Sequence, residues 1–278
     1  MGTGEGVRRF LVALAVAAAL TGPAAAGAQS SAYPDSMAST GDSITRAFNT
    51  GLLPYTDAPR NSWSTGSRAY VWSHYRRILA VNPFIFGRNH NDARSGAEMA
   101  ELDGQMQVVN TQQVEYVTVL IGANDACASS EAAMTPVSDF RAQFARAMNT
   151  ISTGSPTAIV YVVSIPDIYR LWLILHNDPS ARLVWRLTGF CRSMLARPGS
   201  TAPEDEARRQ RVRQRVIEYN GVLEDVCAVF VQCRFDGNAV FNYPFQPRHV
   251  STRDYFHPSL EGQRVLAEVT WNVGPFAG

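Results

Sequence analysis

An excess of charge of either sign is missing from this chain of 278 residues, because 25 lysines and arginines are balanced by 24 aspartates and glutamates. Without a net field, nothing favours nucleic acid or an anionic membrane as a partner. Charged residues make up 18% of the chain and hydrophobic residues 46%, which is typical of one globular core. We therefore expect one main domain that acts on a small, neutral molecule.

Long hydrophobic runs are also scarce. The run at the N-terminus, Phe10–Leu20, follows Arg8 and Arg9 and precedes a cluster of small residues at 24–28. A membrane-spanning helix needs about 20 apolar residues, so this run is too short for the alternative of an N-terminal anchor. The pattern predicts a signal peptide over residues 1–28 and a secreted domain over 29–278 without stable membrane insertion.

Cysteines are few: Cys127, Cys191, Cys227 and Cys233. Export would allow them to form disulfides, and four cysteines permit three pairings. Cys227 and Cys233 are close in sequence and could close a short loop, which would leave Cys127 with Cys191. Zinc binding is the alternative, but the spacings lack a paired C-x-x-C pattern.

Strand-like and helix-like spacings alternate along the rest of the chain. This alternation predicts an α/β fold, a three-layer α/β/α sandwich with a mainly parallel central sheet. A polar loop is expected at 89–96. Strands are expected at 37–40, 84–86, 114–121, 158–163 and 229–235, and helices at 70–80, 97–108, 140–151, 204–226 and 260–270.

The segment 167–198 is rich in large apolar residues, including Trp172 and Trp185. It is predicted to form either a lid or acyl-binding wall, or ordinary packed helices, because periodicity does not separate the two.

Four short motifs follow one another along the chain. Each is weak alone, but their occurrence in this order has a chance probability below about one in a thousand at average residue usage. The motifs are Gly41-Asp42-Ser43-Ile44, Ser95-Gly96, Gly122-Ala123-Asn124-Asp125, and Asp254-Tyr255-Phe256-His257 followed by Pro258.

In these motifs the chain resembles the SGNH hydrolase superfamily of GDSL-type lipases and esterases, from Gly41 to the helix after Pro258. The four cysteines and the Gly-Ala-Asn-Asp-Ala-Cys stretch further resemble secreted bacterial members with disulfides. The resemblance implies a flavodoxin-like sandwich and no metal or cofactor. It implies a catalytic serine, base and orienting acid at Ser43, His257 and Asp254, and an oxyanion hole from Ser43, Gly96 and Asn124.

The residue types suit this chemistry. A serine hydroxyl needs a neutral imidazole to accept its proton, and a carboxylate that fixes the tautomer makes the imidazole a better base. The three-residue spacing of Asp254 and His257 places both side chains on one side of a turn. Asp42 and Asp125 are interpreted as turn-forming or hydrogen-bonding supports.

Four other histidines compete for the role of base. None of them has a carboxylate three residues upstream, so each is interpreted as a surface or packing residue. They are His74, His90, His176 and His249.

The favoured function is hydrolysis of a carboxylic ester, of small-molecule or lipid type, by a monomeric enzyme. Three alternatives stay open: acyl transfer at the same site, deacetylation of a polysaccharide, and a non-catalytic surface-binding module. An α/β-hydrolase is disfavoured because its Gly-x-Ser-x-Gly elbow would need glycine where Thr45 stands.

Overall fold

The computed structural model describes residues 1–2 and 33–277. The described residues 33–277 belong to one compact unit. The signal-peptide prediction falls almost entirely outside the described residues, so it and the domain boundary at residue 29 stay predictions. Within the described part, no helix is long and apolar enough to cross a membrane.

A parallel sheet of five strands forms the middle layer, in the order β2-β1-β3-β4-β5. From β1 the chain goes to β2 at one edge of the sheet and then crosses back to β3 on the other side of β1, so a topological switch point lies between β1 and β3. In such sheets ligands bind outside the carboxyl ends of the strands at this point. The strands are β1 (Met37–Gly41), β2 (Asn89–Asn91), β3 (Tyr116–Leu120), β4 (Ile159–Val162) and β5 (Cys233–Phe235).

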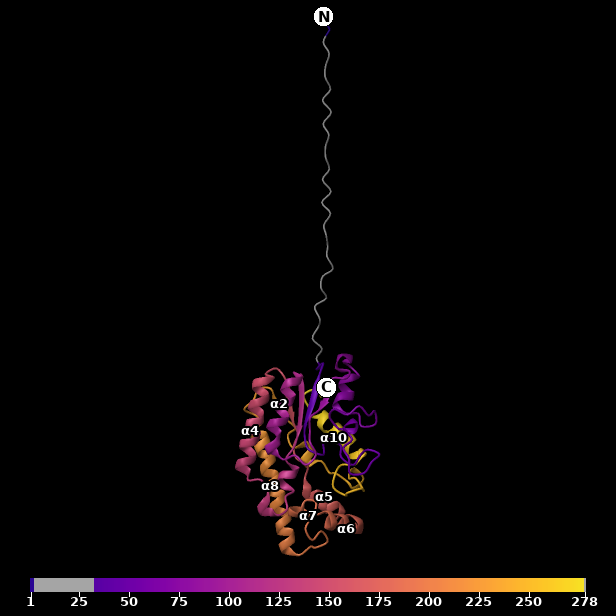
Figure 1. Cartoon of the computed structure of the whole chain (residues 1–278), viewed down its shortest axis with the longest axis vertical. Coiled ribbons are helices and arrows are strands. Elements are labelled where there is room, and N and C mark those ends of the chain that lie inside the picture. Colours follow the sequence, from indigo (N-terminus) through magenta and orange to yellow (C-terminus); the bar gives the residue numbers. More distant parts are fainter. Residues whose placement is uncertain (3–32, 278) are drawn as a thin grey trace. The chain divides into compact units, whose positions relative to one another are not determined.

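Helices cover both faces of the sheet (Figure 1). The α-helices are α1 (His74–Leu79), α2 (Leu102–Gln112), α3 (Ala123–Ala126), α4 (Val137–Gly154), α5 (Ile168–Leu175), α6 (Pro179–Thr188), α7 (Arg192–Leu195), α8 (Pro203–Cys227), α9 (Ala239–Asn242) and α10 (Leu260–Asn272). Short 3-10 helices are η1 (Pro59–Asn61), η2 (Pro83–Ile85), η3 (Met99–Glu101), η4 (Glu131–Ala133) and η5 (Pro247–His249).

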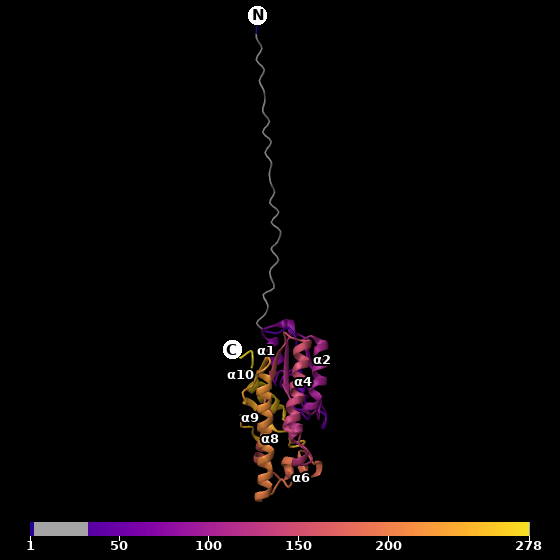
Figure 2. The same cartoon turned by 90° about the vertical axis from the view of Figure 1, so that its left-hand side faces the viewer.

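The two faces of the sheet belong to two apolar clusters. Val117 and Val119 of β3 pack with α2, α4 and α8, whereas Tyr116 and Leu120 point to the other face and pack with α1 and α10. Figure 2 shows α2 and α4 on the side of the sheet opposite α10. Because side chains alternate along a strand and both faces are covered, the strands read as continuous apolar runs. The predicted three-layer α/β/α architecture is confirmed.

Most of the predicted strands and helices are present with shifted ends, but the prediction of a strand at 84–86 is wrong. That segment is the 3-10 helix η2, in which Pro83 occupies the first turn and the Asn82 side chain accepts a hydrogen bond from the Phe84 amide. Phe84 and Phe86 are 71% and 76% exposed, so the apolar run buries only its central Ile85.

The second strand instead lies in the stretch predicted to be a polar loop. β2 forms one edge of the sheet, where its polar side chains find hydrogen bonds: the Asn89 and Asn91 amides donate to the carbonyl oxygens of Thr65 and Thr45. An edge strand that satisfies its side chains in this way needs no apolar pattern.

The segment 167–198 forms α5, α6 and α7 at one end of the domain (Figure 1). Both tryptophans are packing residues: the Trp172 indole donates to the Pro198 carbonyl and lies under the Arg209 guanidinium, and the Trp185 indole donates to the Tyr255 carbonyl. Ordinary helical packing therefore accounts for the tryptophans of this segment.

Candidate active site

Ser43 lies in the turn that directly follows β1. Gly41 ends the strand with φ of +137°, and a Cβ there would collide with the Leu120 carbonyl of the neighbouring strand, so glycine is required. The Gln105 side chain holds the Gly41 peptide on both sides, accepting from its N–H at 2.7 Å and donating to its carbonyl at 2.9 Å. The serine is therefore held at the carboxyl edge of the sheet by a rigid strand end.

Asp254 and His257 lie in a tight turn rather than a helix. The Asp254 Oδ1 accepts the backbone N–H groups of Phe256 (2.9 Å) and His257 (3.1 Å), which closes the turn, and Tyr255 adopts a left-handed conformation with φ of +54°. This local geometry directs both side chains to the same side, as the three-residue spacing predicted.

The three side chains meet in one hydrogen-bonded line. Ser43 Oγ lies 2.8 Å from His257 Nε2, and His257 Nδ1 lies 2.7 Å from Asp254 Oδ2. All three are buried, with exposed fractions of 7% for Ser43, 8% for His257 and 0% for Asp254. Such a line lets the imidazole accept the serine proton while the carboxylate holds the opposite ring nitrogen.

The carboxylate of Asp254 is kept ionised by its hydrogen bonds. Burial alone would raise the pKa of Asp254, but the bonds from the His257 ring, the Phe256 amide and the Asn49 side chain outweigh burial and lower it. The group therefore accepts hydrogen bonds as an anion, which favours the tautomer with the proton on Nδ1 of His257.

The other two predicted site residues, Gly96 and Asn124, lie in neighbouring segments that are joined by a hydrogen bond. Gly96 has φ of +84°, a left-handed conformation that glycine adopts without strain. The Asn124 side chain, in α3 just after β3, donates to the carbonyl of Ala97 at 2.9 Å, which ties it to the residue next to Gly96. Within the described residues, the amides of Ser43 and Gly96 donate to no other group, so both are available together with the second Asn124 proton.

The two acidic residues inside the motifs are supports, as predicted. Asp42 accepts from the Ile44 amide (2.8 Å) and Asp125 accepts from the Met99 amide (2.9 Å). Burial raises the pKa of Asp42 to about 7 and that of Asp125 to about 6. Neither carboxyl contacts the His257 ring by a hydrogen bond.

Two residues outside the four motifs, Asn49 and Asp57, hold the site together. Asn49 donates to Asp254 Oδ2 from 205 residues away. Asp57 accepts from Arg46 Nε at 2.9 Å and from the hydroxyl of Ser95, so it joins the turn after Ser43 to the loop that carries Gly96. No short motif marks Asn49 or Asp57, because their partners are distant in sequence.

A pocket opens from Ser43 and His257 toward α5. Its walls are mostly apolar, and the polar residues in it include Arg170 and His249. The segment 167–198 therefore contributes a wall of the pocket through α5. The apolar lining comprises Ile168, Leu171, Ile174, Phe245, Val250 and Phe256.

The four histidines that competed with His257 for the role of base differ in how deeply they are buried. His74 is a core residue, bonded to the Tyr116 hydroxyl (2.9 Å) and the Thr270 hydroxyl (2.8 Å), and His90 is exposed. His176 is partly buried at the end of α5. His249 is 2% exposed, so it is a packing residue rather than a surface one, and it also lines the pocket.

The four cysteines form two disulfides, Cys127–Cys191 and Cys227–Cys233. This is one of the three possible pairings, and it leaves no thiol for zinc. The first bridge ties the end of α3, which carries Asn124, to the start of α7.

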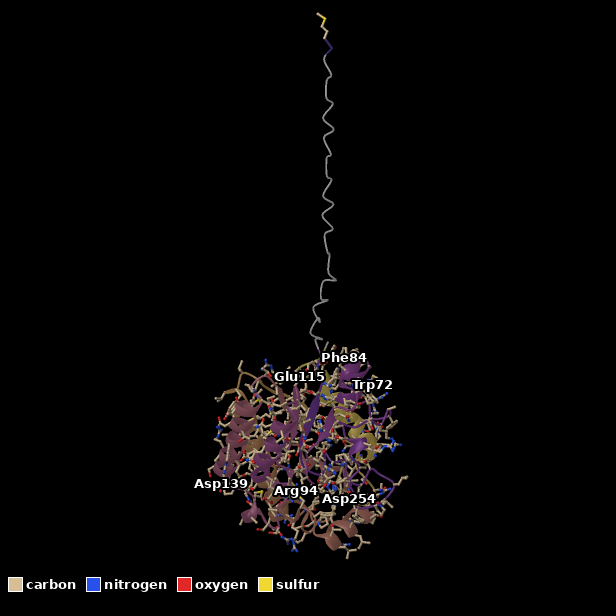
Figure 3. All side chains as sticks on the ribbon, turned by 45° about the horizontal axis from the view of Figure 1, so that its top comes forward. Trp72, Phe84, Arg94, Glu115, Asp139 and Asp254 are labelled. Atoms are coloured by element: carbon tan, nitrogen blue, oxygen red, sulfur yellow. A yellow bond between two sulfur atoms is a disulfide. The ribbon has the colours of Figure 1, made fainter. Side chains whose placement is uncertain are left out.

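Two exposed aromatic residues, Phe84 and Trp72, lie away from the site. In Figure 3, Phe84 and Trp72 lie at one end of the domain and Asp254 at the other.

Comparison with known proteins gives a family match. The GDSL-like Lipase/Acylhydrolase family matches residues 40–265, which include all four motifs. No curated protein matches the chain in sequence.

Two solved structures to which the chain is similar are distant from it in sequence. A family 3 carbohydrate esterase from Clostridium thermocellum is 14% identical, with 85% of this chain and 93% of that chain covered and a TM-score of 0.49. Phospholipase A1 from Streptomyces albidoflavus is 17% identical, with 84% and 95% covered and a TM-score of 0.43.

Proposed function

The chain belongs to the GDSL-like lipase/acylhydrolase family, and from that premise we propose that it hydrolyses carboxylic esters through an acyl intermediate on Ser43. The observation that carries this proposal is the continuous line from Ser43 Oγ to His257 Nε2 and from His257 Nδ1 to Asp254 Oδ2.

The reaction has two halves. His257 takes the proton of Ser43 as the serine oxygen attacks the ester carbonyl, and then gives that proton to the departing alcohol. Water, activated by the same imidazole, attacks the acyl-serine and releases the acid. Asp254 fixes the ring and stabilises the imidazolium in both halves.

The developing oxyanion is bound by three donors: the amides of Ser43 and Gly96 and the side-chain amide of Asn124. These donors stabilise the transition state because they are already in place before the negative charge forms. No free energy is then spent on reorienting them during the reaction. The bond from Asn124 to Ala97 supports this role, since it fixes the orientation of the amide.

The substrate we propose is an ester with a lipid-like or medium-chain group. The apolar walls contributed by α5, Phe245 and Phe256 support this assignment, because they would bury hydrocarbon next to Ser43.

We also propose that the enzyme is exported. Its two disulfides support export, because such bridges persist in oxidising compartments and are rare in the cytosol. Mass spectrometry of protein from the culture medium would then find an N-terminus near residue 29. An intact N-terminus confined to the cell would contradict this part.

The first experiment compares wild type with Ser43→Ala on p-nitrophenyl esters of graded acyl length. We expect the variant to lose turnover and the wild type to prefer chains longer than acetyl. His90→Ala is the matched control, because His90 is exposed and outside the pocket. Wild-type turnover by Ser43→Ala would refute the nucleophile, and added alcohol that diverts product from free acid would indicate acyl transfer.

A further inference from the structure

Asn49 is a buried polar residue in the turn that follows Ser43. It is 3% exposed and has a left-handed backbone conformation with φ of +64°. Its side-chain amide bonds in two directions: Nδ2 donates to Oδ2 of Asp254, and Oδ1 accepts the backbone N–H of Tyr55 at 2.5 Å. Asn49 therefore joins the carboxylate of the triad to the loop at 50–56.

The chemistry of the two partners fixes the orientation of this amide. A backbone N–H can only donate, so the amide oxygen must face Tyr55. An ionised carboxylate can only accept, so the amide nitrogen must face Asp254. An aspartate at this place would keep the acceptor for Tyr55 but would lose the donor to Asp254.

Oδ2 of Asp254, the oxygen that faces His257, receives its second hydrogen bond from Asn49. Oδ1 accepts two backbone N–H groups of its own turn, whereas Oδ2 accepts from the His257 ring and from Asn49. Among the residues that the structure describes, no third group donates to Oδ2. Asp254 is 0% exposed, so bulk water does not replace a missing donor.

The bond from Asn49 restrains the carboxylate and helps to keep it ionised. It limits rotation of the carboxylate, because Oδ2 is held by a side chain other than that of His257. Burial raises the pKa of Asp254, and the bond from Asn49 is one of several that outweigh burial and lower it. Both effects keep an anionic oxygen in place opposite His257 Nδ1 before the imidazolium forms.

We propose that Asn49 is a positioning residue of the reaction, which acts through Asp254 by holding Oδ2 opposite His257 Nδ1. This inference rests on the proposed function, because it concerns the same triad. Asn49 is not among the described residues that line the pocket, so its effect should be on rate rather than on substrate binding. A merely structural role would instead be to anchor the loop at 50–56 through Tyr55.

Two variants separate the bond to Asp254 from the bond to Tyr55. Asn49→Gly keeps the left-handed backbone without strain and removes both bonds. Asn49→Asp keeps the size of the side chain and the acceptor for Tyr55, but it places a second carboxylate oxygen against Oδ2 of Asp254. Thermal unfolding of each variant checks that the fold is native.

We expect both variants to lower kcat on a p-nitrophenyl ester by about 10- to 100-fold, as for the loss of one hydrogen bond to a charged group. KM should change by less than about threefold, because the same imidazole serves both halves of the reaction and both halves slow together.

Asn238→Gly is the matched control, with wild-type kcat expected. Asn238 is also left-handed, with φ of +65°, and its side chain makes no hydrogen bond within the described part of the chain.

A second measurement places Asn49→Gly in the Asp254→Asn background. If Asn49 acts through Asp254, its replacement should cost less than about twofold there, because the line of hydrogen bonds is already broken. A residue that only held the loop would cost the same factor in both backgrounds.

A folded Asn49→Asp enzyme that keeps more than about half of the wild-type kcat would overturn the inference, because the bond to Tyr55 would then be sufficient. Equal losses from Asn49→Gly in the two backgrounds would do the same. If Asn49→Gly does not fold, Asn49→Ser takes its place in this comparison. A wild type that hydrolyses no ester at all would instead refute the proposed function itself.

Discussion

Replacing Asp254 by Asn would reverse one hydrogen bond of the site without changing the size of the side chain. Asp254 Oδ1 accepts two backbone N–H groups, and an Asn oxygen at this place would keep both. The amide nitrogen would then occupy the place of Oδ2, where the His257 ring and the Asn49 amide both donate. The introduced N–H group would face the N–H groups of His257 and Asn49. A change of tautomer at His257 removes the repulsion with the least rearrangement.

In that tautomer, Nδ1 of His257 accepts a hydrogen bond from the introduced amide and the proton sits on Nε2, facing Ser43. The imidazole then has no lone pair for the serine proton, so the general base is lost while the oxyanion hole remains. The corresponding substitution in serine proteases costs about 10⁴-fold in rate. We expect the same order here, which is about 5 kcal/mol of activation free energy.

The assay is kcat/KM of Asp254→Asn and wild type on one p-nitrophenyl ester, with thermal unfolding of both to confirm a native fold. Asp225→Asn is the matched control, because Asp225 is an exposed carboxylate whose side chain pairs with Arg141 on the surface. A folded Asp254→Asn that keeps more than about a tenth of wild-type activity would refute the assignment of Asp254 as the orienting acid.

Three further predictions follow from the same geometry. Asn124→Ala should lower kcat by about 10²- to 10³-fold with a smaller change in KM, as for the loss of one oxyanion donor, and an unchanged kcat would exclude Asn124 from the hole. Since burial raises the pKa of Asp42 from 3.8 to about 7, the folded state holds a proton that the unfolded chain releases, so stability should fall as pH rises between these values. Asp42→Asn should flatten that slope in urea unfolding measured from pH 4 to 7, and an unaltered slope would contradict the pKa. Replacing Cys127 and Cys191 together by Ser opens a bridge across 64 residues and should lower the free energy of unfolding by about 4 kcal/mol, whereas a loss below about 1 kcal/mol would show that the bridge constrains the unfolded chain little.

The local chemistry of the site was readable from short motifs. Gly41, Ser43 and Asn124 stand at the ends of strands, and the spacing of Asp254 and His257 is a property of one turn. Each of these features depends on neighbours within a few residues. The sequence could therefore predict which residues come together at the candidate site and the edge of the sheet where they lie.

The prediction of a strand at 84–86 was wrong because it relied on apolar residues alone. An apolar triplet predicts burial only if the backbone is extended, and Pro83 with the Asn82 cap starts a 3-10 turn instead. The true edge strand β2 is polar, because its side chains bond to carbonyls more than twenty residues away. A search for alternating apolar residues therefore does not detect such a strand.

The parallel α/β class, most of the strands and helices and the identity of the proposed triad could be predicted from the sequence, because these depend on local spacing and on residue chemistry. Only the tertiary structure decided which of three disulfide pairings forms, that Asn49 and Asp57 support the site, and that His249 lines the pocket. The physical reason is that these contacts join segments far apart in the chain. Which residues become partners depends on how the layers pack against one another. A short stretch of sequence does not predict that packing.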